Sequence, residues 1–142
     1  MSKTHKTETM IYKAGGILIK DRKLLVERSQ EKEFFIAPGG SIENGETARQ
    51  ALARELFEEF SIITKEDDFE KFGTFSAMAV GRDNEEIVMD VFIVKSWQGE
   101  PVPSSEVEEI LWISSNIPDG VKVGSIFEHE VLPRLKKADL ID

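Results

Sequence analysis

The stretch from Gly40 to Ile62 reads GSIENGETARQALARELFEEFSI and determines most of what the sequence predicts. From Thr47 to Phe60 it predicts a helix, because apolar residues recur there with a helical period. Thr47 is a favourable N-cap, and Gln50 three residues later completes the pattern of a capping box. The apolar arc of this helix is expected to contain Leu52, Ala53, Leu56, Phe57 and Phe60.

Three glutamates, Glu55, Glu58 and Glu59, occupy a neighbouring arc close to the C-terminal end of the same helix. Each is unfavourable there by about 0.3–1 kcal/mol, because a carboxylate faces the negative end of the helix dipole. A hard divalent cation such as Mg²⁺ requires clustered oxygen ligands of this kind. The alternative is a solvated acidic helix face, which is common in acidic proteins.

The spacing of the whole stretch favours the cation site. Gly40 is followed by five residues, Glu46, seven residues, Arg54-Glu55-Leu56, Phe57, Glu58-Glu59, Phe60, Ser61 and Ile62. This resembles the signature of the Nudix hydrolases: glycine, five residues, glutamate, seven residues, Arg-Glu-hydrophobic, any residue, Glu-Glu, any residue, glycine and a hydrophobic residue. Ser61 departs from it, standing where the family has its last glycine. We refer to residues 40–62 as the box.

The resemblance implies an α/β fold of the α+β type, an α/β/α sandwich with a mixed sheet between helices. The rest of the chain agrees, because strand and helix patterns alternate without a strict repeat. Strands are expected at Met10–Ile19, Lys23–Arg28, Phe34–Ile36, Phe69–Val80, Ile87–Trp97 and Ile110–Ser114.

The connections between these elements also have local signals. Gly15-Gly16 predicts a bulge or a close backbone approach, and Lys20-Asp21-Arg22 predicts a tight turn. Residues 81–84 predict a hairpin turn, and Pro38-Gly39-Gly40 predicts a loop before the box. A last helix is expected to open at Ser125 and to be kinked or broken at Pro133.

The family resemblance also implies roles for the residues of the box. Mg²⁺ or Mn²⁺ would be held by Glu55 and Glu59, with Glu58 as a ligand or as a base acting through water. The carbonyl oxygen of Gly39 would be a further ligand, and Gly39, Gly40 and Phe35 would contact the substrate. Arg54 would orient the carboxylates, and Glu46 would support the junction between loop and helix.

A later segment offers further candidates. Many family members use another glutamate from a later loop, and Glu106 is the first choice here, with Glu109 the second. Glu106 would act as a base or an extra ligand, and the alternative is a solvated loop carboxylate. Phe34, Phe35 and Trp112 could stack on a base, although aromatic residues are more often part of the core.

Composition narrows the class of protein further. The chain has 142 residues, a net charge of −9 and no cysteine, which excludes disulfides, cysteine-ligated metals and thiol nucleophiles. The negative charge disfavours long nucleic acids, and no apolar run is long enough to span a membrane. We expect a flexible tail over residues 1–9, a single domain over residues 10–142 and a cytoplasmic location. The oligomeric state stays open, a homodimer included.

Several substrate classes are disfavoured because this chain lacks residues that the corresponding members of the family carry. It has no cysteine, which isopentenyl diphosphate isomerases need. It has no tyrosine after the box, which diadenosine polyphosphate hydrolases usually carry, and no proline about 15 residues after the box, which ADP-ribose hydrolases often have. What remains is Mg²⁺-dependent hydrolysis of a nucleoside diphosphate linked to another group, with a MutT-like nucleoside triphosphate pyrophosphohydrolase as first choice. The alternative, motivated by Ser61, is a catalytically degenerate member that senses a ligand or binds a protein.

Overall fold

The computed structural model describes residues 9–78 and 85–142. Its largest sheet has the order β5-β1-β7-β6, with bounds Gly39–Ser41, Thr9–Ile17, Glu85–Val94 and Phe69–Met78. β1 runs parallel to β7, whereas β5 and β6 are antiparallel to their neighbours, so the sheet is mixed as predicted. The expected turn at 81–84 and all but the last residue of the expected tail lie outside the described residues.

A second, antiparallel sheet contains β2 (Ile19–Lys20), β3 (Lys23–Ser29) and β8 (Val107–Ile113). β2 and β3 are joined by the predicted tight turn, in which Asp21 and Arg22 both have positive φ. A parallel pair, β4 (Phe34–Phe35) and β9 (Lys122–Val123), completes the strands of the described residues.

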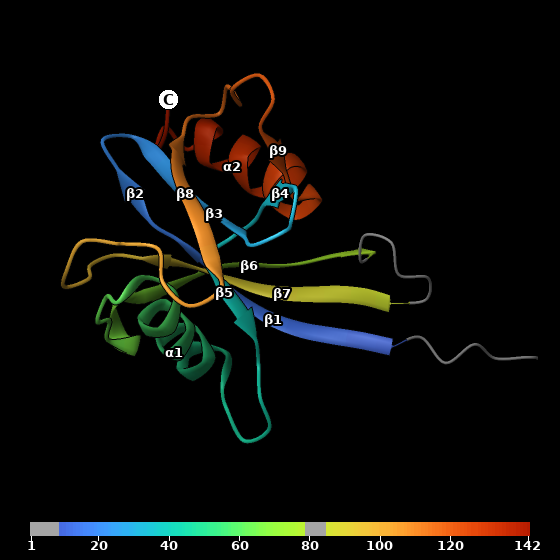
Figure 1. The fold of residues 1–142 in the computed structure, drawn as a ribbon, viewed down its shortest axis with the longest axis vertical. Helices are drawn as coiled ribbons and strands as arrows, with labels where there is room; N and C mark the ends of the chain where they lie inside the picture. Colours follow the sequence, from blue (N-terminus) through green and yellow to red (C-terminus); the bar gives the residue numbers. More distant parts are fainter. Residues whose placement is uncertain (1–8, 79–84) are drawn as a thin grey trace, which may run out of the picture.

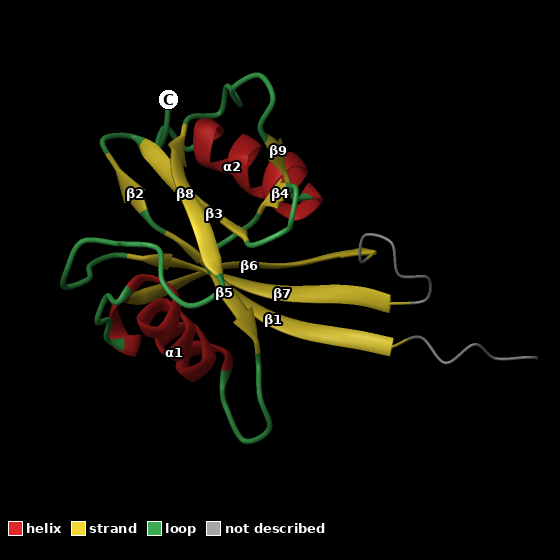
Figure 2. Cartoon of the chain, viewed as in Figure 1, coloured by secondary structure: helices red, strands yellow, loops and turns green. Residues whose placement is uncertain are grey.

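Helices cover both sides of these strands (Figures 1 and 2). The box helix α1 (Ala48–Phe60) lies on one side, and a π-helical turn η2 (Phe127–Val131) followed by α2 (Leu132–Lys137) lies on the other. Successive side chains of β3 point to opposite faces, so they pack in both apolar cores. Leu25 packs in the core that contains α1, whereas Leu24 and Val26 pack in the core that contains α2. A 3₁₀ turn, η1 (Glu66–Asp68), leads into β6.

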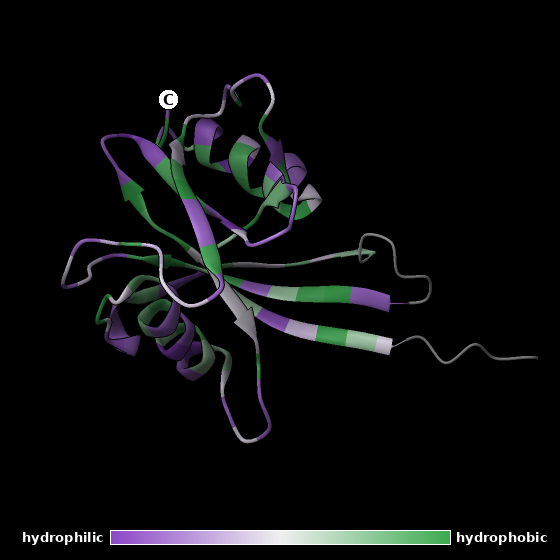
Figure 3. Ribbon diagram, in the orientation of Figure 1, coloured by the Kyte–Doolittle hydropathy of each residue, from purple (hydrophilic) through white to green (hydrophobic). Residues whose placement is uncertain are grey.

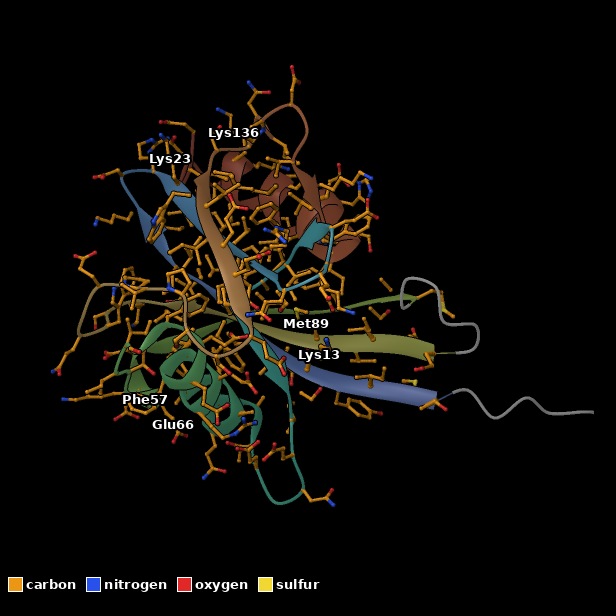
Figure 4. All side chains as sticks on the ribbon, viewed as in Figure 1. Lys13, Lys23, Phe57, Glu66, Met89 and Lys136 are labelled. Atoms are coloured by element: carbon orange, nitrogen blue, oxygen red, sulfur yellow. The ribbon has the colours of Figure 1, made fainter. Side chains whose placement is uncertain are left out.

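The predicted box helix is confirmed together with its cap. Thr47 accepts a hydrogen bond from the backbone N–H of Gln50 (3.1 Å), and the Gln50 side chain accepts one from the N–H of Thr47 (2.9 Å). The prediction for Phe57 is wrong: its side chain is 59% exposed and points away from the core (Figure 4). Ala51 is buried as well, so the buried arc is shifted away from Phe57 and toward the face that carries Glu55 and Glu59.

Three further elements differ from the expectation. The segment expected to be only a loop before the box forms β5, whose Gly39 and Gly40 pair with Gly15 and Ala14. Strand β9 had no local signal, because its pairing with β4 joins segments far apart in sequence. The last helix begins at Ser125 as expected and is not broken at Pro133, because the helical backbone continues from η2 into α2; the distortion is the π-helical turn η2 directly before Pro133.

The outer halves of β1 and β7 extend beyond both helices (Figure 1). In Figure 3 hydrophobic colour continues along the middle of β7, between its charged end and Asp90. Lys13 of β1 is in register with Met89 of β7, and the two side chains lie side by side on this extension (Figure 4). The extension therefore places a lysine beside the loop that begins the box.

Candidate metal and substrate site

The site is built where β5 meets α1, and two glycines allow the close approach. Gly39 has φ +134°, and a Cβ atom there would collide with the carbonyl oxygen of Ala14. At Gly40 a Cβ atom would lie 2.6 Å from Cδ of Glu55 and 2.8 Å from both of its carboxylate oxygens. The space that a side chain would occupy at Gly40 is therefore filled by the Glu55 carboxylate.

The backbone of Gly39 faces the box helix. Gly16 donates to the carbonyl of Pro38 (2.8 Å) and Ile42 donates to the carbonyl of Tyr12 (3.0 Å), which sets the alternation of the ladder between β1 and β5. Because ladder bonds alternate in an antiparallel pair, the N–H and C=O of Gly39 point away from β1. The N–H instead donates to Oε1 of Glu59 (3.0 Å), which fixes this carboxylate against the loop.

Arg54 connects the loop and the helix through carboxylates. It donates to both oxygens of Glu46 (Nε–Oε2 2.7 Å, Nη2–Oε1 3.0 Å), and also to Oε1 of Glu55 (2.8 Å) and Oε1 of Glu58 (3.1 Å). These hydrogen bonds lower the pKa of Glu46 to about 2, with a further contribution from the N–H of Glu43. The guanidinium thus has the geometry to orient two glutamates of the cluster and to hold the segment before the helix.

The glutamates of the cluster differ in burial. Glu55 and Glu59 are half-buried, and burial is the main cause that raises the pKa of each carboxyl group above its ordinary value. Arg54 opposes the rise at Glu55, and the Gly39 N–H opposes it at Glu59. The Glu58 side chain is 50% exposed, so it lies at the rim of the cluster.

A fourth carboxylate, Glu27 of β3, was missed by the sequence reasoning. Glu27 is 1% exposed, and its carboxyl group hydrogen-bonds to that of Glu59 when one of the two carries a proton. No donor from the described part of the chain reaches its buried Oε2. Burial and the neighbouring charge of Glu59 raise the pKa of Glu27 strongly. The segment Lys23–Arg28 gives no hint of this, because one glutamate near a strand end is ordinarily solvated.

The two later glutamates lie in different places. Ser104 donates from Oγ to the carbonyl of Glu58 (2.6 Å) and from its N–H to the carbonyl of Glu59 (2.9 Å). These two bonds bring the loop that contains Glu106 to the C-terminal end of α1. Glu106 itself is exposed. Glu109 instead pairs with Arg28 on the neighbouring strand (3.2 Å), and no contact joins it to the cluster within the described residues.

The aromatic candidates are mainly core residues. Phe35 is 5% exposed in the cluster that packs on α2, with the guanidinium of Arg28 5.9 Å from its ring centre. Phe34 is half-buried beneath Lys122, and Trp112 packs against the cluster that contains α1. None of the three contacts the carboxylates in the described part of the chain, so their stacking on a base stays a prediction.

Ser61 ends the box helix as a glycine would. Its φ and ψ are 59° and 28°, the left-handed conformation, and its N–H donates to the carbonyl of Phe57 (2.9 Å). Ile62, which follows, is fully buried beside the helix. The serine therefore carries some backbone strain, and the helix that holds Glu58 and Glu59 ends with a left-handed residue, as a glycine there would allow.

The profile of the NUDIX domain matches residues 11–133, which is most of the chain and includes the whole box. The chain belongs to the NUDIX domain family. An uncharacterized Nudix hydrolase of Bacillus subtilis, YvcI, is 30% identical over 104 residues, covering 70% of this chain and 63% of that protein. An 8-oxo-dGTP diphosphatase of Escherichia coli is 38% identical over 85 residues, 60% of each chain. Each match spans less than two thirds of the relative's own length.

Solved Nudix structures show the same fold. A MutT protein from Methanosarcina mazei Go1 superposes with a TM-score of 0.75 at 16% identity, covering 95% of this chain and 99% of that one. At this identity the likeness concerns the fold alone. The expected Nudix sandwich is therefore confirmed.

The oxygen donors of this Nudix site fit a hard cation. The Gly39 carbonyl, Glu55 and Glu59 surround the close approach of β5 and α1, and Glu27 adds an oxygen without a hydrogen-bond donor. Among the described residues no three acidic or histidine side chains already form a compact ligand set. Glu55 and Glu58 are held instead by Arg54, so cation binding requires these side chains to shift. In the same residues, no helix is long and apolar enough to cross a membrane.

Proposed function

We propose that the chain is a Mg²⁺- or Mn²⁺-dependent hydrolase of a nucleoside diphosphate linked to another group, with nucleoside triphosphates as the first choice. The observation that carries this proposal is the close approach of β5 to α1, where glycine backbone and glutamate carboxylates share one small space. The relative named an 8-oxo-dGTP diphosphatase supports the choice of substrate class.

The chain's own residues would do the following. Glu55, Glu58, Glu59 and the carbonyl of Gly39 would hold the cation, which supplies charge neutralisation for the diphosphate and a more acidic bound water. Arg54 would keep the carboxylates oriented through the hydrogen bonds described above. Water adds to phosphorus, the phosphoanhydride P–O bond breaks, and a carboxylate accepts the proton. Glu58 would accept it where it is not itself a ligand, and Glu106, whose loop is joined to the C-terminal end of α1 through Ser104, is the other candidate.

Lys13 supports an anionic substrate. It is half-buried on β1, and its charge acts on Glu27, which places it near the cluster. Within the described residues it forms no ion pair or hydrogen bond of its own, so its ammonium group is free to bind a phosphate oxygen. In a chain of net charge −9, a free lysine beside clustered carboxylates is a specific arrangement rather than part of a basic surface.

The test is a panel of nucleoside triphosphates, oxidised nucleotides and nucleotide sugars, incubated with the protein and Mg²⁺ and resolved by chromatography. We expect a nucleoside monophosphate as one product, loss of turnover in excess EDTA and recovery with Mg²⁺ or Mn²⁺. Turnover that persists in EDTA would overturn the proposed cation site. A folded protein that releases no product across the panel would instead favour the ligand-sensing alternative.

A further inference from the structure

Glu27 is the one fully buried acidic or basic side chain in the residues that the structure describes. Its carboxyl group occupies the α1 side of β3, on the same strand face as Leu25, which packs in the cluster of apolar residues around α1. Burying a carboxyl group among apolar residues is costly unless hydrogen bonds or a cation compensate. The contacts of Glu27 do not supply that compensation.

The backbone holds Glu27 in place independently of its side chain. Its N–H donates to the carbonyl of Ile36 (2.9 Å), and its carbonyl accepts from the N–H of Ile36 (2.7 Å). This bridge fixes the direction of the side chain toward α1. The pairing of β3 with the segment before β5 therefore holds the strand so that the Glu27 side chain lies on the α1 side.

The surroundings of the Glu27 carboxyl group are acidic. It lies against Glu59, and Glu55 is near enough to raise its pKa as well, whereas the charge of Lys13 opposes them. Among residues 9–78 and 85–142, no arginine or lysine donates a hydrogen bond to it, and its Oε2 is buried without a donor. If Glu27 served the fold through an ion pair, a cationic side chain would be bound to it. If it served the fold through hydrogen bonds, both of its oxygens would have partners.

Building on the proposed function, we propose that Glu27 is a fourth carboxylate of the divalent-cation site, binding together with Glu59 the cation that the box holds. Oxygen ligands from a second element would explain both the unpartnered Oε2 and the contact with a box glutamate. Because Glu27 comes from β3, it would tie the cation to the sheet as well as to the helix and the loop.

The experiment measures Mn²⁺ binding directly, by electron paramagnetic resonance of free Mn²⁺ during titration of the wild-type chain and variants. Glu27→Gln keeps the size and removes the negative charge. We expect its Mn²⁺ affinity to fall at least tenfold, and the Mn²⁺-induced rise in melting temperature to shrink accordingly. In EDTA its melting temperature is expected to stay the same or rise, because a buried charge without a donor has been removed.

Two further variants make the result specific. Glu108→Gln, on β8, removes an exposed carboxylate that pairs with Arg28, one residue along from Glu27, and is expected to leave Mn²⁺ affinity unchanged. Glu27→Met fills a similar volume without polar atoms, so it folds without needing any partner and is expected to lose Mn²⁺ affinity like Glu27→Gln.

The outcomes separate this inference from the proposed function. If Glu59→Gln loses Mn²⁺ binding while both Glu27 variants bind as tightly as wild type, Glu27 is not part of the site and the proposed function stands. Wild-type chain that binds no Mn²⁺ would overturn both. A Glu27→Gln variant that is less stable in EDTA but binds Mn²⁺ normally would show that Glu27 serves only the fold.

Discussion

Arg54 holds Glu46 through two parallel hydrogen bonds, Nε–Oε2 at 2.7 Å and Nη2–Oε1 at 3.0 Å. The pair joins the helix to the segment before it, and the same guanidinium extends to Glu55 and Glu58. Bidentate pairing of this kind fixes the plane of the arginine as well as its distance. The orientation of Glu55 and Glu58 is thus coupled to Glu46 through the guanidinium that all three share.

The Arg54–Glu46 pair predicts a pH dependence of stability. The folded-state pKa of Glu46 is lowered from 4.5 to about 2, so its contribution is present above pH 4.5 and is lost as pH falls toward 2. As pH falls from 4.5 toward 2, the melting temperature of the wild type should therefore fall more than that of Glu46→Gln. The control is Glu43→Gln, whose exposed carboxylate lies 3.8 Å from Arg54. Parallel pH profiles for wild type and Glu46→Gln would contradict the prediction.

Glu59→Gln distinguishes a role of Glu59 in catalysis from a role in folding stability. Gln keeps an oxygen that can accept from the Gly39 N–H, but it removes the charge that a cation requires. We expect the catalytic rate to fall a hundredfold or more, about 2.7 kcal/mol of barrier. Stability in EDTA should stay the same or rise, since a charge leaves the unfavourable end of the helix. Glu66→Gln, on the exposed turn η1, is the control for activity, and a destabilised but fully active Glu59→Gln would remove Glu59 from the site.

Ser61→Gly tests whether the departure from the box is merely structural. Ser61 is left-handed with φ 59°, which costs a non-glycine residue about 1–2 kcal/mol, while glycine costs about 0.5–1 kcal/mol more backbone entropy on folding. The net expectation is a gain of about 0.5–1 kcal/mol in unfolding free energy, measured by urea denaturation. Activity per folded molecule should not change. A large rise in activity would show that the serine had impaired the site.

Lys13→Met tests the proposed contact with a phosphate. Met keeps the length and apolar stem of the side chain without its charge, so KM should rise about tenfold, or about 1.4 kcal/mol, with a smaller change in kcat. Lys23→Met is the matched control, because Lys23 is an exposed lysine on β3, distant from Lys13 (Figure 4). Equal KM values for the two variants would exclude Lys13 from substrate binding.

The box and its helix could be predicted from the sequence because their determinants are local. The capping box of Thr47 and Gln50 spans four residues, and the carboxylates of Glu55 and Glu59 share a helix face because they are four positions apart. The tight turn at Asp21 and Arg22 is likewise decided by adjacent residues. Such features need no information about which distant segment packs against them.

The tertiary structure decided the features that depend on distant contacts. Glu27 and Glu59 lie 32 positions apart in the numbering, and only the packing of β3 against α1 turns an ordinary strand glutamate into a buried member of the cluster. Phe57 has the spacing of a core residue but is exposed, because the sheet does not reach that side of the helix. The pairing of β4 with β9 has the same origin. A sequence pattern records which side chains share a face of one element, whereas burial and pairing depend on the second element that covers that face.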